Sequence, residues 1–309
     1  MNVIQTSGLG KRYGGGWALR DCTLALAAGH LAAIVGPNGA GKTTLLNMLA
    51  GLAMPTAGTA TVLGDQDPGS AAALDSIAFV AQDAPVYKNL LVSDMVHLTR
   101  NLNRHFDQRY ARARLAQLEI PLKKRAGKLS GGQQAQLALT LALARRPRLL
   151  ILDEPLSSLD PLARRDFLTT VLTAMADDGV SVLLSSHSLP ELDRVADYLI
   201  VLARGRLQLA GEIDEVLARH RLLTGPAGEA GACARRFPTV QVQQADAQAH
   251  LLVATDAADP APPGWEAHPV GLEELVLAYL RAPSERALGR AGLPGLSHVD
   301  QAEPTRAAR

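Results

Sequence analysis

The sequence of 309 residues lacks the features that mark several large classes of protein. It has two cysteines, Cys22 and Cys233, and no Cys-x-x-Cys spacing, which argues against a disulfide framework or a cysteine-rich zinc site. Aromatic residues make up 4% of the chain, so the apolar core must consist mainly of Ala, Leu and Val. A net charge of +1 gives the chain no overall attraction for nucleic acid. We therefore expect reduced thiols, an aliphatic core and no nucleic-acid partner.

The sequence also has no run that approaches the roughly 20 apolar residues of a membrane-spanning helix. Residues 1–10 lack the basic start and the apolar stretch of a signal peptide. We therefore expect a soluble, cytoplasmic protein. A role at the membrane would require a separate chain that crosses it and holds this one at the cytoplasmic face.

Apolar patterning predicts alternating strands and helices over residues 1–210. The expected strands are 3–6, 24–27, 31–35, 77–80, 149–152, 180–185, 199–202 and 206–210. The expected helices are 42–50, about 92–122, and 132–145. Buried strands that alternate with helices are typical of an α/β fold with a mostly parallel sheet. Because residues 88–146 show no strand pattern, we expect them to form a helical subdomain inserted into that core.

The pattern changes after residue 211. The sequence predicts a helix at 212–220, a small strand pair at 239–243 and 251–254, and an amphipathic helix at 271–281. Residues 282–309 show no periodicity, and we predict a disordered tail there. The expected division is a main domain at 1–220, a small C-terminal α+β region at 221–281, and the tail.

Residues 36–44, Gly-Pro-Asn-Gly-Ala-Gly-Lys-Thr-Thr, follow an expected strand and open an expected helix. A phosphate-binding loop requires this context. Glycines let successive backbone N–H groups turn toward one centre, and the helix N-terminus adds positive potential. We expect Lys42 to reach the β- and γ-phosphates of a nucleotide and the Thr43 hydroxyl to bind Mg²⁺.

Two further segments carry chemistry of the same kind. The apolar strand 149–152 ends at Asp153, which is placed to hold Mg²⁺, and Glu154, which is placed to polarise an attacking water. Residues 129–133, Leu-Ser-Gly-Gly-Gln, precede a predicted helix that Ser130 can cap, and the glycines expose N–H groups for a second anion. One phosphate loop with a second phosphate-directed segment suggests that two chains share each nucleotide.

In order and spacing these motifs resemble the nucleotide-binding domain of the ABC superfamily, over about residues 2–215. The matching elements are the phosphate loop at 36–44, the Q-loop at Gln82, the signature at 129–133, the acidic strand end at 149–154, the D-loop at 157–160 and the switch histidine His187. Tyr13 matches the aromatic residue that stacks on adenine. The resemblance implies a P-loop NTPase core with an antiparallel β subdomain, and an ATPase that works as a homodimer or heterodimer on a membrane permease.

The resemblance also implies a role for each site residue. Catalysis is expected of Glu154, His187, Gln82 and Lys42. Metal binding is expected of Thr43, Gln82 and Asp153. Binding of the cofactor ATP is expected of Tyr13, Asn38, Gly39, Ala40, Gly41, Lys42, Thr43, Thr44, Ser130, Gly131, Gly132, Gln133 and Asp160. The signature residues and Asp160 would act across the dimer, so that two ATP molecules lie between two chains.

The transporter type is a separate prediction. Residues 271–280 resemble the closing helix of ATPase subunits from bacterial ABC-2-type exporters, so we expect an export ATPase that pairs with a separate permease. An import ATPase, an ABC ATPase that acts on DNA or the ribosome, and a subunit that binds nucleotide without hydrolysis are the alternatives. The intact Glu154 and His187 argue against the last. After Gln133 the chain runs Gln-Ala-Gln where the family usually has an arginine, which puts one local polar contact in doubt.

Overall fold

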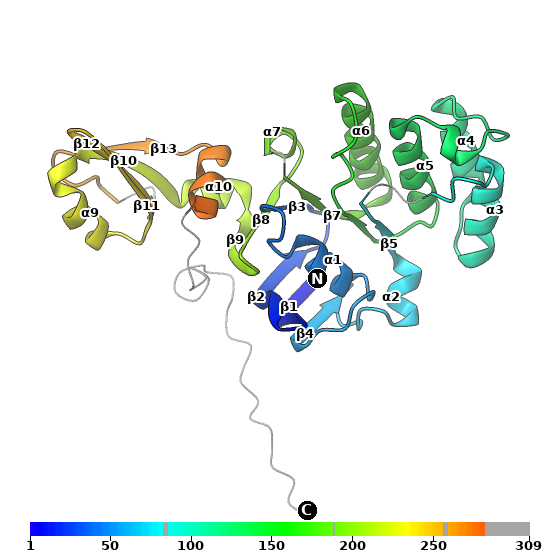
Figure 1. Cartoon of the computed structure of the whole chain (residues 1–309), viewed down its shortest axis with the longest axis horizontal. Helices are drawn as coiled ribbons and strands as arrows, with labels where there is room; N and C mark the ends of the chain where they lie inside the picture. The colour runs from blue at the N-terminus through cyan, green and yellow to red at the C-terminus, as the bar shows by residue number, and fades with distance from the viewer. Residues whose placement is uncertain (83–85, 188, 256–258, 282–309) are drawn as a thin grey trace, which may run out of the picture.

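The computed structural model describes residues 1–82, 86–187, 189–255 and 259–281, and these ranges contain three sheets (Figure 1). The largest has six strands in the order β5-β6-β7-β3-β8-β9. They are β3 (Leu31–Val35), β5 (Ile77–Val80), β6 (Leu149–Leu152), β7 (Ser181–Ser186), β8 (Tyr198–Ala203) and β9 (Arg206–Glu212). The first five in spatial order run parallel, and β9 runs antiparallel to β8. The predicted α/β fold with a mostly parallel sheet is confirmed.

This sheet is buried on both faces, which explains why β3 reads as an unbroken apolar run. Leu31, Ala33 and Val35 belong to the apolar cluster that includes α5 (Gly131–Leu143) and α6 (Pro161–Asp178). Ala32 and Ile34 belong to the opposite cluster, with α1 (Lys42–Leu49). Helix α6 was not among the predicted helices.

The second sheet is antiparallel, in the order β2-β1-β4, and confirms the predicted β subdomain. It consists of β1 (Asn2–Tyr13), β2 (Gly16–Ala27) and β4 (Ala57–Val62). The predicted strands 3–6 and 24–27 are parts of the much longer β1 and β2. Strand β4 and the short α2 (Ala71–Ser76) were not predicted. The backbone N–H of Arg20 donates to the carbonyl of Gly205 at 2.7 Å and ties this sheet to the β8–β9 hairpin.

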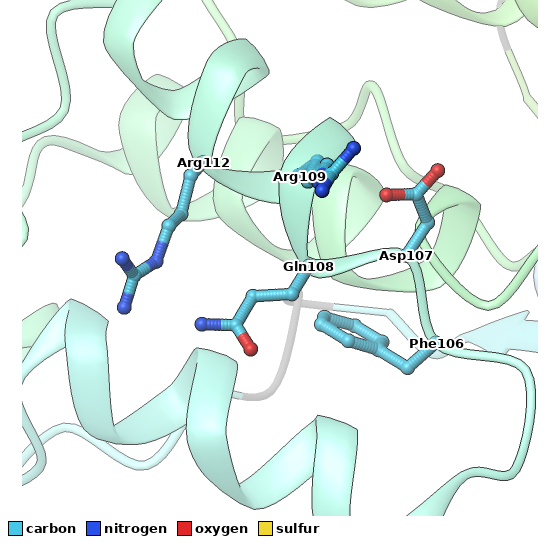
Figure 2. Close-up of a pocket in the computed structure, with 5 residues that line it drawn as sticks. All are labelled: Phe106, Asp107, Gln108, Arg109 and Arg112. Atoms are coloured by element: carbon cyan, nitrogen blue, oxygen red, sulfur yellow. The ribbon is translucent and has the colours of Figure 1, made fainter.

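Residues 92–143 form α3 (Val92–Leu102), α4 (Gln108–Gln117), a 3-10 turn (Ala126–Lys128) and α5. The single helix predicted at about 92–122 is wrong. Asp107 breaks it, because its carboxylate accepts the N–H of Tyr110 at 2.9 Å as the N-cap of α4 and pairs with Arg146 at 2.8 Å. A shallow hollow at this turn is lined by Phe106, Asp107, Gln108, Arg109 and Arg112 (Figure 2).

After the short α7 (Leu189–Leu192) and α8 (Ile213–Ala218), a third sheet has the order β11-β12-β10-β13. Its strands are β10 (His220–Pro226), β11 (Thr239–Ala245), β12 (Gln248–Ala254) and β13 (Glu266–Pro269). The predicted strand pair is the β11–β12 hairpin, and β10 and β13 were missed. A 3-10 turn (Ala227–Glu229) leads into α9 (Ala230–Arg236), which covers one face.

Helix α10 (Leu272–Arg281) confirms the predicted amphipathic helix. Leu275, Val276 and Tyr279 are buried in the same apolar cluster as the six-stranded sheet. The predicted disordered tail at 282–309 lies outside the described residues.

Candidate active site

The phosphate loop follows β3 and ends in the first turn of α1, as its sequence predicts. Gly41 caps α1 in a left-handed conformation with φ of 103°, which an L side chain rarely adopts. At Gly36 the constraint is close approach, because a Cβ there would lie 2.2 Å from the carbonyl oxygen of Leu202. The loop is therefore held between β8 and α1 in one backbone path. Asn38, Gly39 and Thr43 are exposed, Ala40 is buried, and Thr44 is half-buried.

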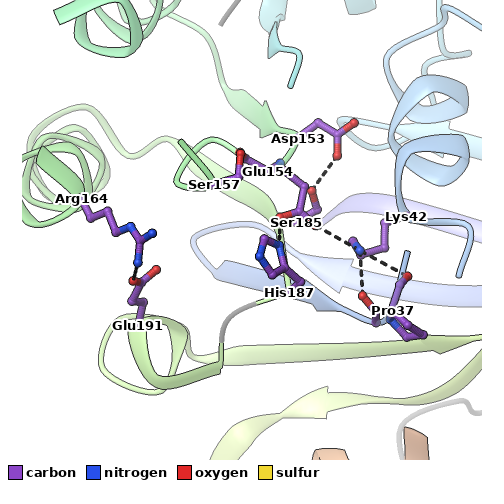
Figure 3. A network of polar contacts seen from close by, with 10 residues as sticks. Pro37, Lys42, Asp153, Glu154, Ser157, Arg164, Ser185, His187 and Glu191 are labelled. Atoms are coloured by element: carbon purple, nitrogen blue, oxygen red, sulfur yellow. Dashed lines mark hydrogen bonds and ion pairs between the residues drawn. The ribbon is translucent and has the colours of Figure 1, made fainter. Parts of the chain in front are cut away.

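Lys42 is the buried cation of this loop, only 5% exposed. Its Nζ donates to the carbonyl of Gly36 at 2.7 Å and lies 3.4 Å from the carbonyl of Pro37 (Figure 3). The same Nζ lies 3.1 Å from Oε1 of Glu154, which is 8% exposed. Because that Oε1 accepts no hydrogen bond, the contact is an ion pair without hydrogen-bond geometry. A cation so placed can exchange these partners for phosphate oxygens.

The two carboxylates follow β6 and are fixed by a residue at the end of β7. The Ser185 hydroxyl donates to Oδ1 of Asp153 at 2.7 Å and accepts the backbone N–H of Glu154 at 2.8 Å. Glu154 has a φ of 47°, which is uncommon for a non-glycine residue and turns its side chain away from that of Asp153. Sequence reasoning missed Ser185. The signal that could have found it is a polar residue at the carboxyl end of a strand predicted next to β6.

His187 lies one residue beyond β7, and its Nδ1 is 2.7 Å from Oε2 of Glu154 (Figure 3). Its side chain is 58% exposed, so its other ring nitrogen is free for an incoming group. Gln82 is exposed and lies two residues beyond β5, which neighbours β6. The structure brings Lys42 and His187 each into contact with Glu154, whereas none of the described hydrogen bonds joins Gln82 to these residues.

Tyr13 ends β1 and is 53% exposed, with the Lys11 ammonium 5.2 Å from its ring centre. The hairpin that carries it approaches the phosphate loop, because a Cβ on Gly41 would lie 2.7 Å from the carbonyl oxygen of Ala18 in β2. An exposed aromatic ring on this hairpin is available for a flat ligand.

The signature segment forms the N-terminus of α5. Ser130 and Gln133 make a reciprocal capping box, with N–H to oxygen distances of 3.2 and 3.3 Å. Gly132 lies close to α6, because a Cβ there would be 3.1 Å from that of Ala163. Asp160 caps α6 by accepting the N–H groups of Leu162 and Ala163 at 3.0 and 2.9 Å. Gly131 is exposed, and no described hydrogen bond joins this segment to the phosphate loop of the same chain.

Three comparisons with known proteins agree with this geometry. A family model described as ABC transporter matches residues 19–157. The thiamine import ATP-binding protein ThiQ of Salmonella typhimurium is 36% identical over 201 residues, which cover 63% of this chain and 86% of ThiQ. The chain belongs to the ABC transporter family of ATP-binding proteins. A solved structure of the ATP binding subunit of an ABC transporter shares 26% identity at a TM-score of 0.62, over 69% of this chain and 91% of that one.

The protein is thus an ATP-binding subunit of an ABC transporter and an ATPase, as its motifs predicted. The Fe(3+) ions import ATP-binding protein FbpC of Pseudomonas fluorescens is 38% identical over 218 residues, which cover 68% of this chain and 62% of FbpC. Both relatives are named for import, so the predicted export function finds no support among them. None of the helices in the described residues is long and apolar enough to cross a membrane.

Proposed function

We propose that this chain hydrolyses ATP to drive the import of a solute through a separate membrane permease. The observation that carries import is the similarity to two import ATPases that differ in cargo, one named for thiamine and one for Fe(3+). The permease supplies the path across the membrane, and we place this subunit on its cytoplasmic face. Export is the competing proposal that the experiment must exclude.

The contacts of Glu154 support its proposed role as the residue that polarises the attacking water. Its carboxylate is held between Lys42 at 3.1 Å and the His187 ring at 2.7 Å. When phosphates bind, Lys42 would turn to them, and Glu154 would be left with an unpaired oxygen directed at the site. His187 would then contact the γ-phosphate from its exposed side. A buried carboxylate in this position can act as a general base.

The donor set fits Mg²⁺. Asp153 supplies a carboxylate, Thr43 a hydroxyl and Gln82 an amide oxygen, all hard oxygen ligands of the kind that Mg²⁺ prefers. Among the described residues, no cluster of three acidic, histidine or cysteine side chains could hold a metal by itself. We therefore propose that the ion binds together with the nucleotide phosphates and neutralises their charge. Ser185 would keep the Asp153 carboxylate in place through its 2.7 Å hydrogen bond.

We further propose that two copies enclose each ATP. No described hydrogen bond joins the signature residues Ser130 and Gly132 to their own phosphate loop, and we propose that they contact the nucleotide bound by the partner. Asp160, whose Oδ1 already caps α6, would act from the same side. Tyr13 would stack on the adenine. The domain division proposed from sequence, 1–220 with a helical subdomain at 88–146 and a C-terminal region at 221–281, remains our working description.

Transport direction is tested in cells that carry the wild-type chain or Lys42→Ala. Thiamine and Fe³⁺ serve as first cargoes, together with a metabolite survey of cells and medium. If the chain drives import, cells with the variant should contain less of the transported solute than wild-type cells, and the solute should remain in the medium. Accumulation of a solute inside the variant cells would overturn import in favour of export. Purification of the wild-type chain from membranes should also recover a permease, and membrane binding of the isolated chain alone would contradict the proposed assembly.

A further inference from the structure

Strand β11 (Thr239–Ala245) is an unprotected edge of the C-terminal sheet. Its sequence, Thr-Val-Gln-Val-Gln-Gln-Ala, has no charged residue and no proline. The opposite edge, β13 (Glu266–Pro269), is short, carries a glutamate and ends in a proline, which are the usual means of preventing further pairing. Among the described residues no backbone hydrogen bond occupies the outer side of β11. Within the part of the chain that the structure describes, this edge can therefore accept another strand.

The hairpin geometry identifies which backbone groups are free. Asp246 and Ala247 form a two-residue turn between Ala245 and Gln248, with Asp246 at a φ of 48°. Residues that flank such a turn exchange hydrogen bonds, and the exchange recurs at every second residue. Ala245, Gln243 and Gln241 therefore face β12. The N–H and C=O groups of Val242 and Gln244 point to the outer edge.

We propose that β11 pairs antiparallel with β11 of a second copy of this chain, about a two-fold axis at Gln243. A register shift at Val240 limits the regular part of the strand to Gln241–Ala245. Pairing centred on Gln243 places Val242 of each copy opposite Gln244 of the other. All the outward N–H and C=O groups of the regular part of the strand then form hydrogen bonds. The result is four hydrogen bonds and one continuous sheet through both copies.

The side chains suit this self-pairing. Val242 is 44% exposed although its neighbour in register, Leu251, is fully buried in the cluster under α9. A second strand would shield Val242 with the aliphatic part of the opposing Gln244. On the other face Gln243 meets its own copy, and two primary amides can each donate and accept. With no charge in the strand, no like charges oppose each other.

Pairing over five residues covers a small area, so the contact alone is weak. It needs neither ATP nor the permease, and it lies outside the proposed nucleotide sandwich. Within a transporter the two ATPase subunits are already held near each other, which raises the effective concentration of one edge for the other. The contact is therefore best detected by trapping it covalently in the full chain without nucleotide.

The test is Gln243→Cys, with the chain oxidised by diamide in EDTA and without nucleotide. Opposed residues at the two-fold axis form a non-hydrogen-bonded pair with Cα atoms about 4.5 Å apart, within reach of a disulfide. Gln241→Cys is the matched control, since it lies on the same face of the same strand. In this register Gln241 lies opposite Ala245 of the other copy, four residues away from the other Gln241. The Cα atoms of the two Gln241 residues are then about 14 Å apart, too far for a disulfide. The buried Cys22 and Cys233 give the background in the wild-type chain.

The proposal predicts a disulfide-linked dimer for Gln243→Cys and none above background for Gln241→Cys. Adding Val242→Lys should abolish the cross-link, because it brings a charge to the shared edge, whereas Leu172→Lys, at a 39% exposed apolar residue of α6, should not. Equal cross-linking of the two cysteine variants would mean random collision and would overturn the proposal. Absence of a Gln243→Cys dimer at high protein concentration would overturn it as well. Neither result bears on the ATPase proposal, because no nucleotide is present.

Discussion

The ion pair between Lys42 and Glu154 makes a prediction about nucleotide affinity as well as catalysis. Both side chains are more than nine-tenths buried, and Nζ lies 3.1 Å from Oε1. At an effective dielectric constant of about 20, two unit charges at this distance attract by about 5 kcal/mol. Burial of both charges offsets most of that attraction, so we take about 1.5 kcal/mol, the lower end of the coupling energies of close buried charge pairs. Phosphates that bind Lys42 must replace this pair.

Glu154→Gln removes the negative charge and keeps the shape of the side chain. We expect ATP to bind this variant about tenfold more tightly in EDTA, since about 1.5 kcal/mol no longer has to be overcome. Hydrolysis with Mg²⁺ should fall at least 100-fold, because an amide cannot act as a base. Titration with a fluorescent ATP analogue measures the first effect, and phosphate release measures the second.

Glu191→Gln is the matched control for this substitution. Glu191 is a partly buried carboxylate paired with Arg164 at 2.5 Å, near the site but without contact with Lys42 (Figure 3). It should leave ATP affinity and turnover close to those of the wild type. Wild-type affinity in Glu154→Gln would refute the competition between Glu154 and phosphate for Lys42. Wild-type turnover in that variant would refute the role of Glu154 as the base.

Three other predictions concern single residues. Lys42→Ala should abolish hydrolysis in a phosphate-release assay while circular dichroism shows a folded chain, and unchanged activity would refute the phosphate-loop assignment. Gly36→Ala should cost at least about 1–3 kcal/mol in urea unfolding, because its Cβ would meet the Leu202 carbonyl at 2.2 Å; Gly15→Ala, with open space around it, should cost far less. Burial lowers the pKa of His220, so its stabilising contribution is complete above about pH 6.5 and is lost as pH falls further. His220→Gln should therefore flatten the dependence of the melting temperature on pH between about 7.5 and 5.5, and an unchanged slope would contradict this.

The central part of the fold was predictable because local pattern and motif agree there. A phosphate loop needs a strand before its glycines and a helix after its lysine. The sequence shows the apolar run of β3, the glycines and the helix after Lys42 in that order, so this part could be predicted directly. The break between α3 and α4 was not predictable in this way. It depends on the pairing of Asp107, at the turn between α3 and α4, with Arg146, which lies just beyond the end of α5. Helix α6 did have a local signal, since Asp160 caps it and Pro161 occupies its first position.

The site was predictable in its residue types and not in its contacts. The sequence places Lys42, Glu154 and His187 after three different strands, and only the strand order β6-β7-β3 makes them neighbours. The bridging Ser185 was missed because a polar residue at the end of a strand points to the site only once β7 is known to lie beside β6. Strand β10 was missed because it, too, depends on neighbours that the local sequence does not reveal. Its pairing with β12 and β13 is formed by segments that follow it in the chain.

The C-terminal region is joined to the ATPase core by more than its linker. Buried residues of α10, including Val276, belong to the same apolar cluster as the strands that carry the site. The imidazole of His220 lies 2.7 Å from the carbonyl of Val216 in α8 and 2.8 Å from the hydroxyl of Tyr279 in α10, so one buried side chain ties the two helices together. A displacement of α10 therefore requires either breaking these hydrogen bonds or moving α8 with it. Because α8 directly follows β9, such a displacement reaches the edge of the central sheet, and a contact between two C-terminal sheets has a direct physical route to the ATPase core.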